Sequence, residues 1–192
     1  MSVVDRLHAA PVIATLFGTT DLDTFLQAPT VFCFLANLPL VQVGPVVQQV
    51  QEAGSFVILN VDTVKGLSAN PDGLDYLRSV GVMGIVSTHA AVVAKAANSG
   101  LLTLQKVFAT DRSNLPRIRA SIAQSRPHLV QLMPWPVVPR LRGEFLEAMP
   151  SFIVSGFVHD RADVDEALEL GAVAVSTSQQ DLWVPMEGKN HG

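Results

Sequence analysis

The chain is poor in cysteine, in charge and in aromatic side chains. Its 192 residues include a single cysteine, Cys33, so no internal disulfide can form and no cysteine cluster is available to bind zinc. Cys33 stands in an apolar run, where we expect a reduced and buried thiol. The five histidines show no ligand spacing. The composition therefore predicts neither a metal site nor a bound cofactor.

Charged residues make up only 16% of the chain, whereas an average soluble domain carries about 25%. Apolar residues account for 48%, and the mean hydropathy is +0.34. This low charge excludes a disordered chain and indicates a compact globule with a large buried core. At this length we expect one domain, residues 1–192.

Long hydrophobic runs are absent as well. The longest uncharged stretch, residues 24–51, is interrupted by Pro29, Pro39 and Pro45, whereas a membrane span needs about 20 predominantly apolar residues in unbroken helix. Residues 1–6 show no basic segment followed by an apolar run, which is the pattern of a secretory signal. We therefore expect a cytoplasmic protein with no membrane partner.

Short apolar runs alternate with segments whose apolar residues recur at helical spacing. The runs are rich in β-branched and aromatic residues and apolar on both faces, which is typical of strands in a parallel sheet covered by helices. Eight strands are predicted, at 12–16, 30–36, 56–61, 83–87, 101–108, 129–133, 152–155 and 172–176. Helices are predicted between them, at 41–53, 74–80, 90–99, 115–125, 137–149 and 162–170.

Four glycines, Gly54, Gly81, Gly100 and Gly171, follow helical segments at the position where a left-handed cap favours glycine. The repeat of helix, glycine and strand leaves two α/β architectures, a closed TIM-like (β/α)8 barrel or an open doubly wound sheet. Eight units favour the compact barrel, whose length requires short loops and a reduced last helix. We expect residues 184–192 to form a frayed tail.

Small polar residues follow the predicted strands, at the end of a barrel where ligands bind. Ser155 and Gly156 after strand seven, and Ser176, Thr177 and Ser178 after strand eight, resemble the phosphate-binding loops of many barrels. Tight turns that cap the following helices explain the same residues equally well. Both interpretations stay open at the level of spacing.

Three further polar residues near strand ends have more than one interpretation. Asp62 can be interpreted as a contact to ligand hydroxyl groups, as a catalytic acid or base, or as a structural hydrogen-bond acceptor for a neighbouring loop. Lys106 is a Schiff-base lysine or a positive charge offered to an anionic ligand. His89 meets an anion or carries a proton, or it is an exposed residue at a helix start.

Charge is unevenly distributed along the chain. Residues 106–142 hold seven basic residues and one acidic residue, a net +6, while the remainder holds six basic and sixteen acidic residues, a net −10. Such a window indicates a surface for nucleic acid or phosphate, or else a pair of solvated helices whose arginine stems cover apolar surface. The candidate RNA-binding residues in it are Arg117, Arg119, Arg126, Arg140 and Arg142.

Several motifs in chain order resemble the glycerol-3-phosphate-responsive antiterminators of glycerol uptake operons. Together they cover most of the chain, and the Ser-Thr-Ser and Leu-Trp pair near the end add most to the resemblance. The motifs are 60–67, 84–88, 105–108 with Asp111 and Ser113, 132–134 with Pro139, Gly156 followed by 163–170, and 172–178 with Leu182 and Trp183. The chain departs from the family pattern at His89, Lys106, Trp135 and Ser155.

The resemblance implies a TIM-like barrel that binds glycerol 3-phosphate and, when loaded, acts on leader mRNA to prevent premature transcription termination. It implies a regulator with no catalytic residues. The phosphate is then expected at Gly156 and 176–178. Further ligand contacts are expected from Asp62, Ser87, His89, Lys106 and Ser155.

A different class of function remains open beside this one. The same loops and the same Lys106 or Asp62 suit a lyase-like or isomerase-like barrel enzyme acting on a small phosphorylated metabolite. The sequence does not determine the oligomeric state, and the light charge of the chain leaves a homodimer open as a hypothesis.

Overall fold

The computed structural model describes residues 3–141 and 143–184. Within them, eight parallel strands close into a barrel in which each strand pairs with the next and β8 pairs with β1. The predicted (β/α)8 barrel is therefore confirmed, and the open sheet is excluded. Strands β1 to β8 are Val12–Phe17, Phe32–Ala36, Phe56–Asn60, Gly84–Ser87, Leu102–Phe108, Leu129–Met133, Phe152–Ser155 and Ala174–Thr177.

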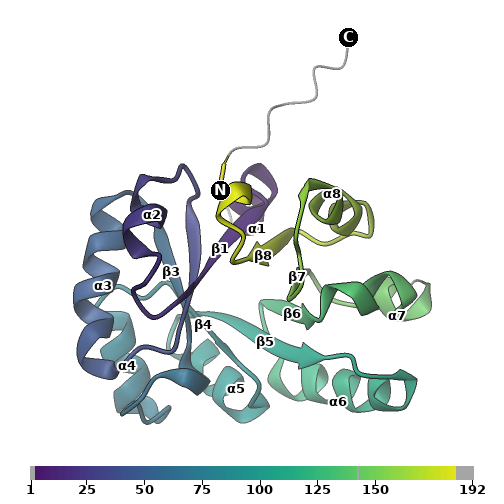
Figure 1. Ribbon diagram of the computed structural model, residues 1–192. Coiled ribbons are helices and arrows are strands. Elements are labelled where there is room, and N and C mark those ends of the chain that lie inside the picture. The colour runs from purple at the N-terminus through teal and green to yellow at the C-terminus, as the bar shows by residue number, and fades with distance from the viewer. Residues whose placement is uncertain (1–2, 142, 185–192) are drawn as a thin grey trace.

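Helices α2 to α8 surround the strands (Figure 1). The described helices α1 to α8 are Val3–Ala9, Leu22–Gln27, Leu40–Glu52, Pro71–Ser79, Ala90–Asn98, Leu115–Ser125, Glu144–Glu147 and Arg161–Glu169. Short 3-10 helices η1 to η4 follow strands at Val61–Thr63, Arg112–Asn114, Trp135–Leu141 and Gln180–Leu182. The single turn of η4 after β8 confirms the reduced last helix.

The boundaries follow local chemistry. The four glycines predicted to end helices all adopt positive φ angles, between 76° and 93°. Helix α4 begins at Pro71, earlier than predicted, because Asn70 Oδ1 accepts a hydrogen bond from the Gly73 N–H and caps the first turn. Residues 185–192, most of the predicted tail, lie outside the described residues.

The helix predicted at 137–149 is wrong. The segment after β6 is instead the 3-10 helix η3, followed by the single turn of α7. Pro136 and Pro139 lack the N–H groups that an α-helix needs, and Gly143 has a φ angle of 88°. The apolar spacing is satisfied all the same, because Val138 and Leu141 are buried.

Side chains alternate between two buried layers. On β1, Ala14 and Leu16 point outward into the core beneath the helices, whereas Ile13 points into the barrel. The half of the barrel interior near the beginnings of the strands is filled by apolar side chains such as Phe32, Ile58 and Leu104. Leu7 of α1 is fully buried against this inner cluster, so α1 closes the end where the strands begin.

Cys33 lies on β2 and is fully buried, as expected, and burial raises the pKa of its thiol. In the described part of the chain, no helix combines the length and hydropathy that crossing a membrane requires.

Candidate ligand-binding site

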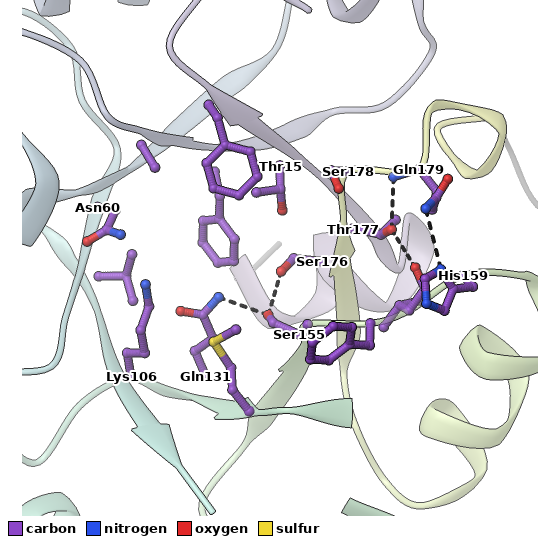
Figure 2. A pocket seen from close by; sticks show the side chains of 18 residues that line it. Thr15, Asn60, Lys106, Gln131, Ser155, His159, Ser176, Thr177, Ser178 and Gln179 are labelled. Atoms are coloured by element: carbon purple, nitrogen blue, oxygen red, sulfur yellow. Dashed lines mark hydrogen bonds between the residues drawn. The ribbon is translucent and has the colours of Figure 1, made fainter. Parts of the chain in front are cut away.

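A cavity of about 420 Å³ opens at the end of the barrel where the strands finish. Every strand contributes a lining residue, and the loops after β7 and β8 complete the rim (Figure 2). The side chains that point inward near the strand ends are polar on six strands and apolar on β2 and β4. These polar residues are Thr15, Asn60, Lys106, Gln131, Ser155 and Ser176.

The floor of the pocket is a hydrogen-bonded polar cluster with unused acceptors. Gln131 Nε2 donates to Ser155 Oγ over 2.8 Å, and the hydroxyl groups of Ser155 and Ser176 hydrogen-bond to each other. Within the part of the chain that the structure describes, no group donates a hydrogen bond to Gln131 Oε1 or to Asn60 Oδ1, although both residues are more than nine-tenths buried. Buried oxygens without donors are costly, so these two atoms favour a ligand that brings hydroxyl groups.

Lys106 supplies the positive charge of the pocket. Its side chain is half-buried, and among the described lining residues it is the one lysine or arginine. Desolvation lowers the pKa of Lys106, while the negative charge of Asp62 opposes that shift. Figure 2 shows Lys106 on the same side of the pocket as Asn60 and Gln131.

The opposite side of the pocket is built by the loops after β7 and β8. Thr177 Oγ1 donates to the Val158 carbonyl over 2.9 Å and accepts from the Gln179 N–H over 3.0 Å, so it joins the two loops. Gly156 begins the first loop with a φ angle of 79°. Ser178, Gln179 and His159 lie together at this rim in Figure 2.

Asp62 lies just outside the pocket, where it fastens the loop that follows β4. Its carboxylate accepts from Ser87 Oγ (2.5 Å), from the Thr88 N–H (2.7 Å) and from Thr88 Oγ1 (2.8 Å). Gln105 Nε2 donates to the carbonyls of Ser87 and Thr88 and holds the same loop from β5. We call Asp62, Ser87, Thr88 and Gln105 the β4 latch.

Of the nine predicted ligand-binding residues, six line the pocket and three do not. Those that line it are Lys106, Ser155, Gly156, Ser176, Thr177 and Ser178. Asp62 and Ser87 belong to the β4 latch, and His89 is exposed at the start of α5. Direct contact with a ligand stays a prediction for all nine.

A comparison with known families matches residues 12–183 to the model of the glycerol-3-phosphate responsive antiterminators. The chain belongs to this family. The family resemblance found in the sequence is thereby confirmed.

The chain is also similar to three individual proteins. The glycerol uptake operon antiterminator regulatory protein of Listeria monocytogenes superposes with a TM-score of 0.82 at 24% identity, covering 90% of this chain and 94% of the other. A related protein of Thermotoga maritima gives 0.79 at 21%, covering 90% and 96%. The uncharacterized protein YgcP of Escherichia coli K12 is 25% identical over 185 residues, 95% of this chain and 96% of that protein.

Sequence reasoning missed part of the pocket of this family member. The residues it missed are polar side chains on the inner face, Thr15, Asn60 and Gln131, and the rim residues His159 and Gln179. The alternation of side chains along each strand could have found the first three, because Asn60 is separated by one residue from Ile58, which points into the barrel. The rim residues lie in loops, to which no such period applies.

The candidate RNA-binding arginines lie on the segments that follow β5 and β6. Arg117 and Arg119 lie on α6, Arg126 follows its last turn, and Arg140 lies on η3. All four are exposed, although Arg119 stacks on the Phe145 ring with 5.4 Å between its guanidinium and the ring centroid. Arg117 and Arg126 are separated by roughly 14 Å along the helix direction. Arg142 lies outside the described residues.

Proposed function

We propose that this chain binds glycerol 3-phosphate in the pocket and, when loaded, binds leader mRNA in the cytoplasm to prevent transcription termination ahead of glycerol-utilisation genes. The observation that carries the ligand half is one pocket that combines the cationic Lys106 with buried oxygens lacking donors. A phosphorylated polyol complements both, since it supplies an anion and hydroxyl groups.

The two sides of the pocket suggest how the ligand is oriented. The donor-poor oxygens of Asn60 and Gln131 suit the hydroxyl groups of the glycerol moiety. The loops at Gly156 and at Ser176 to Ser178 suit the phosphate, because their backbone and hydroxyl groups can donate to it without a long side chain in the way. Lys106 then attracts the phosphate through a half-buried space in which screening is reduced.

Thermal unfolding in the presence of glycerol 3-phosphate, glycerol and inorganic phosphate tests the ligand. A ligand at 100 times its Kd stabilises the native state by about 2.7 kcal/mol, so glycerol 3-phosphate should raise the Tm in a concentration-dependent way. Phosphate alone should act more weakly and glycerol least. An equal shift from inorganic phosphate would reduce the site to a general anion site, and no shift at millimolar glycerol 3-phosphate would contradict the proposal.

Binding to the leader transcript at several salt concentrations tests the RNA half. The chain should bind the transcript only when glycerol 3-phosphate is present. Its affinity for the RNA should fall steeply as the salt concentration rises, because contacts to RNA phosphates release counterions. Reversing the charge at Arg117, Arg126 or Arg140 should reduce the slope of log affinity against log salt concentration by about one unit each. Arg78→Glu is the matched control, because Arg78 is an exposed arginine on α4 outside residues 106–142. It should leave the RNA affinity and its salt dependence unchanged. Salt-independent binding, or binding without ligand, would contradict this half.

The second candidate function is a lyase-like enzyme that forms an imine on Lys106, and it rests on the half-buried position of this lysine in the pocket and on its lowered pKa. A lysine whose pKa is lowered by burial supplies more neutral amine, which can attack a carbonyl carbon and release water as an imine forms. Treating the protein with a phosphorylated ketone and borohydride would then reduce that imine to a stable adduct on Lys106. Mass spectrometry that finds no adduct, together with a Tm raised by glycerol 3-phosphate, favours the sensor over the lyase-like enzyme.

A further inference from the structure

We propose that Trp135 and Asp163 are positioning residues that hold the loop Gly156 to His159 in the shape that binds the phosphate of the ligand. This inference rests on the proposed function and extends it to two residues outside the pocket lining. Neither residue lines the cavity, yet the contacts of both end on residues that do. We call this pair the η3–α8 bridge.

The η3–α8 bridge is a direct hydrogen bond between two elements that flank the loop. Trp135 opens η3, is 3% exposed, and donates from its indole Nε1 to Asp163 Oδ1 over 2.7 Å. Asp163 lies in the first turn of α8, where its own N–H is bound by the carboxylate of Asp160. A buried indole that donates to a carboxylate fixes both side chains in one rotamer.

Both ends of the loop attach to this bridge. The Trp135 N–H donates to the Gly156 carbonyl over 3.0 Å, and the other Asp163 oxygen, Oδ2, accepts from the His159 N–H over 2.7 Å. The first and last residues of the loop are thus tied to the two members of one hydrogen-bonded pair. Gly156 and His159 both line the pocket, so a shift of the bridge moves two lining residues at once.

The conformation of the loop shows why it needs such support. Phe157, which follows Gly156, has a φ angle of 63° although it is not glycine, and the residue is 67% exposed. A bulky residue in this region is held there by its surroundings rather than by its own preference. Since the exposed side chain of Phe157 adds little packing, the backbone around it is held by its neighbours. The η3–α8 bridge holds Gly156 and His159 at the two ends of the loop, and Thr177 Oγ1 holds the Val158 carbonyl between them.

Titration calorimetry with glycerol 3-phosphate on Trp135→Phe, Asp163→Asn and the double variant tests this role. Trp135→Phe keeps an aromatic ring at this buried position and removes the indole N–H. Each single variant should weaken binding on the order of tenfold, and the double variant should be no weaker than the poorer single, because all three break the same bridge. Additive losses would overturn the idea of a single bridge.

Asp111→Asn is the matched control. Asp111 also caps a short helix with its carboxylate at the same end of the barrel, where it accepts from the N–H groups of Ser113 and Asn114, but it does not line the pocket. This control should leave glycerol 3-phosphate affinity unchanged. An equal loss of affinity in Asp111→Asn would show a general effect of removing loop caps and would overturn the specific role of the bridge.

Amide hydrogen exchange over residues 156–159 gives a readout that needs no ligand. Exchange should become faster in Trp135→Phe and in Asp163→Asn, and should stay unchanged in Asp111→Asn. If the wild-type chain binds no glycerol 3-phosphate, the proposed function fails while this measurement still reports on the loop. Unchanged exchange in both bridge variants, or faster exchange with undiminished affinity, would overturn the positioning role.

Discussion

The two sides of the barrel mouth use similar residues in opposite ways. After β3 and β4, the carboxylate of Asp62 and the hydroxyl groups of Ser87 and Thr88 hydrogen-bond to one another. After β7 and β8, the hydroxyl groups of Ser155 and Ser176 face the cavity. The difference follows from the position of each residue along its strand, because successive side chains alternate between the barrel interior and the helix layer.

Lys106 and Gln105 illustrate this rule on one strand. Lys106 points into the pocket, whereas its neighbour Gln105 is buried on the other face and belongs to the β4 latch. Ser87 pairs in register with Gln105, so it shares that outward face. The comparison predicts that changes in the pocket affect ligand affinity, while changes in the β4 latch affect stability.

The largest expected effect is the loss of ligand affinity in Lys106→Met. Methionine keeps much of the length and apolar surface of the side chain but removes the charge that attracts the phosphate. Binding of glycerol 3-phosphate should weaken about 100-fold, or about 2.7 kcal/mol, in calorimetric titration. The free energy of unfolding should be unchanged or higher, because a half-buried charge is no longer desolvated. Undiminished affinity would show that Lys106 does not attract the phosphate across the pocket.

Asp62→Ala should lower the stability of the fold more than the ligand affinity, which is the opposite of Lys106→Met. It removes the acceptor of three hydrogen bonds, and the buried Ser87 hydroxyl loses the acceptor for its proton. We expect urea unfolding to report a loss of about 2 kcal/mol. Glycerol 3-phosphate affinity should fall by less than in Lys106→Met. A larger loss of affinity than of stability would show that Asp62 contacts the ligand directly.

The barrel was accessible from the sequence because its signals are local and repeated. Runs apolar on both faces, such as 56–61, and glycines after helices, such as Gly171, each follow from short-range chemistry. The segment after β6 was predicted wrongly because its apolar spacing resembles a helix, while Pro136 and Pro139 prevent one.

The candidate site was only partly accessible, for a different physical reason. Strand ends could be located to within a residue or two, but a shift of one residue exchanges the inward and outward faces. Asn60, which lines the pocket, is therefore missed by a reading of strand ends. Ser87, whose contact with the ligand stays a prediction, lies in the β4 latch. The contact between Trp135 and Asp163 joins residues 28 positions apart, and no local pattern encodes such a pairing.

Gly156→Ala compared with Gly54→Ala should show a smaller effect that separates backbone strain from position. Both glycines have a φ angle of 79°, so alanine carries a similar cost of about 1–2 kcal/mol at either site. A Cβ at Gly54 meets nothing within 4 Å, whereas one at Gly156 lies 3.0 Å from Met133 Cε. Calorimetry should find weaker ligand binding in Gly156→Ala alone. Equal affinities in both variants would remove the Gly156 loop from the site.

The smallest expected effect is the pH dependence that Lys106 introduces. Its pKa in the folded chain lies below the ordinary 10.5, mainly through desolvation. Below the folded pKa, the lysine is charged in both states and its burial destabilises the fold in full. Between the folded pKa and 10.5, the unfolded chain binds more protons, so stability rises with pH. Urea unfolding should show this rise in the wild type and not in Lys106→Met.

Ligand affinity should change in the opposite direction over the same interval. As pH rises through the folded pKa, the amine of Lys106 becomes neutral and attracts the phosphate less. Asp62→Ala should move this loss of affinity to lower pH, because the carboxylate of Asp62 is the charge that raises the pKa of Lys106. The β4 latch would then affect the pocket through its electrostatic field alone. A pH profile of affinity that is identical in Asp62→Ala and the wild type would show that the two regions act independently.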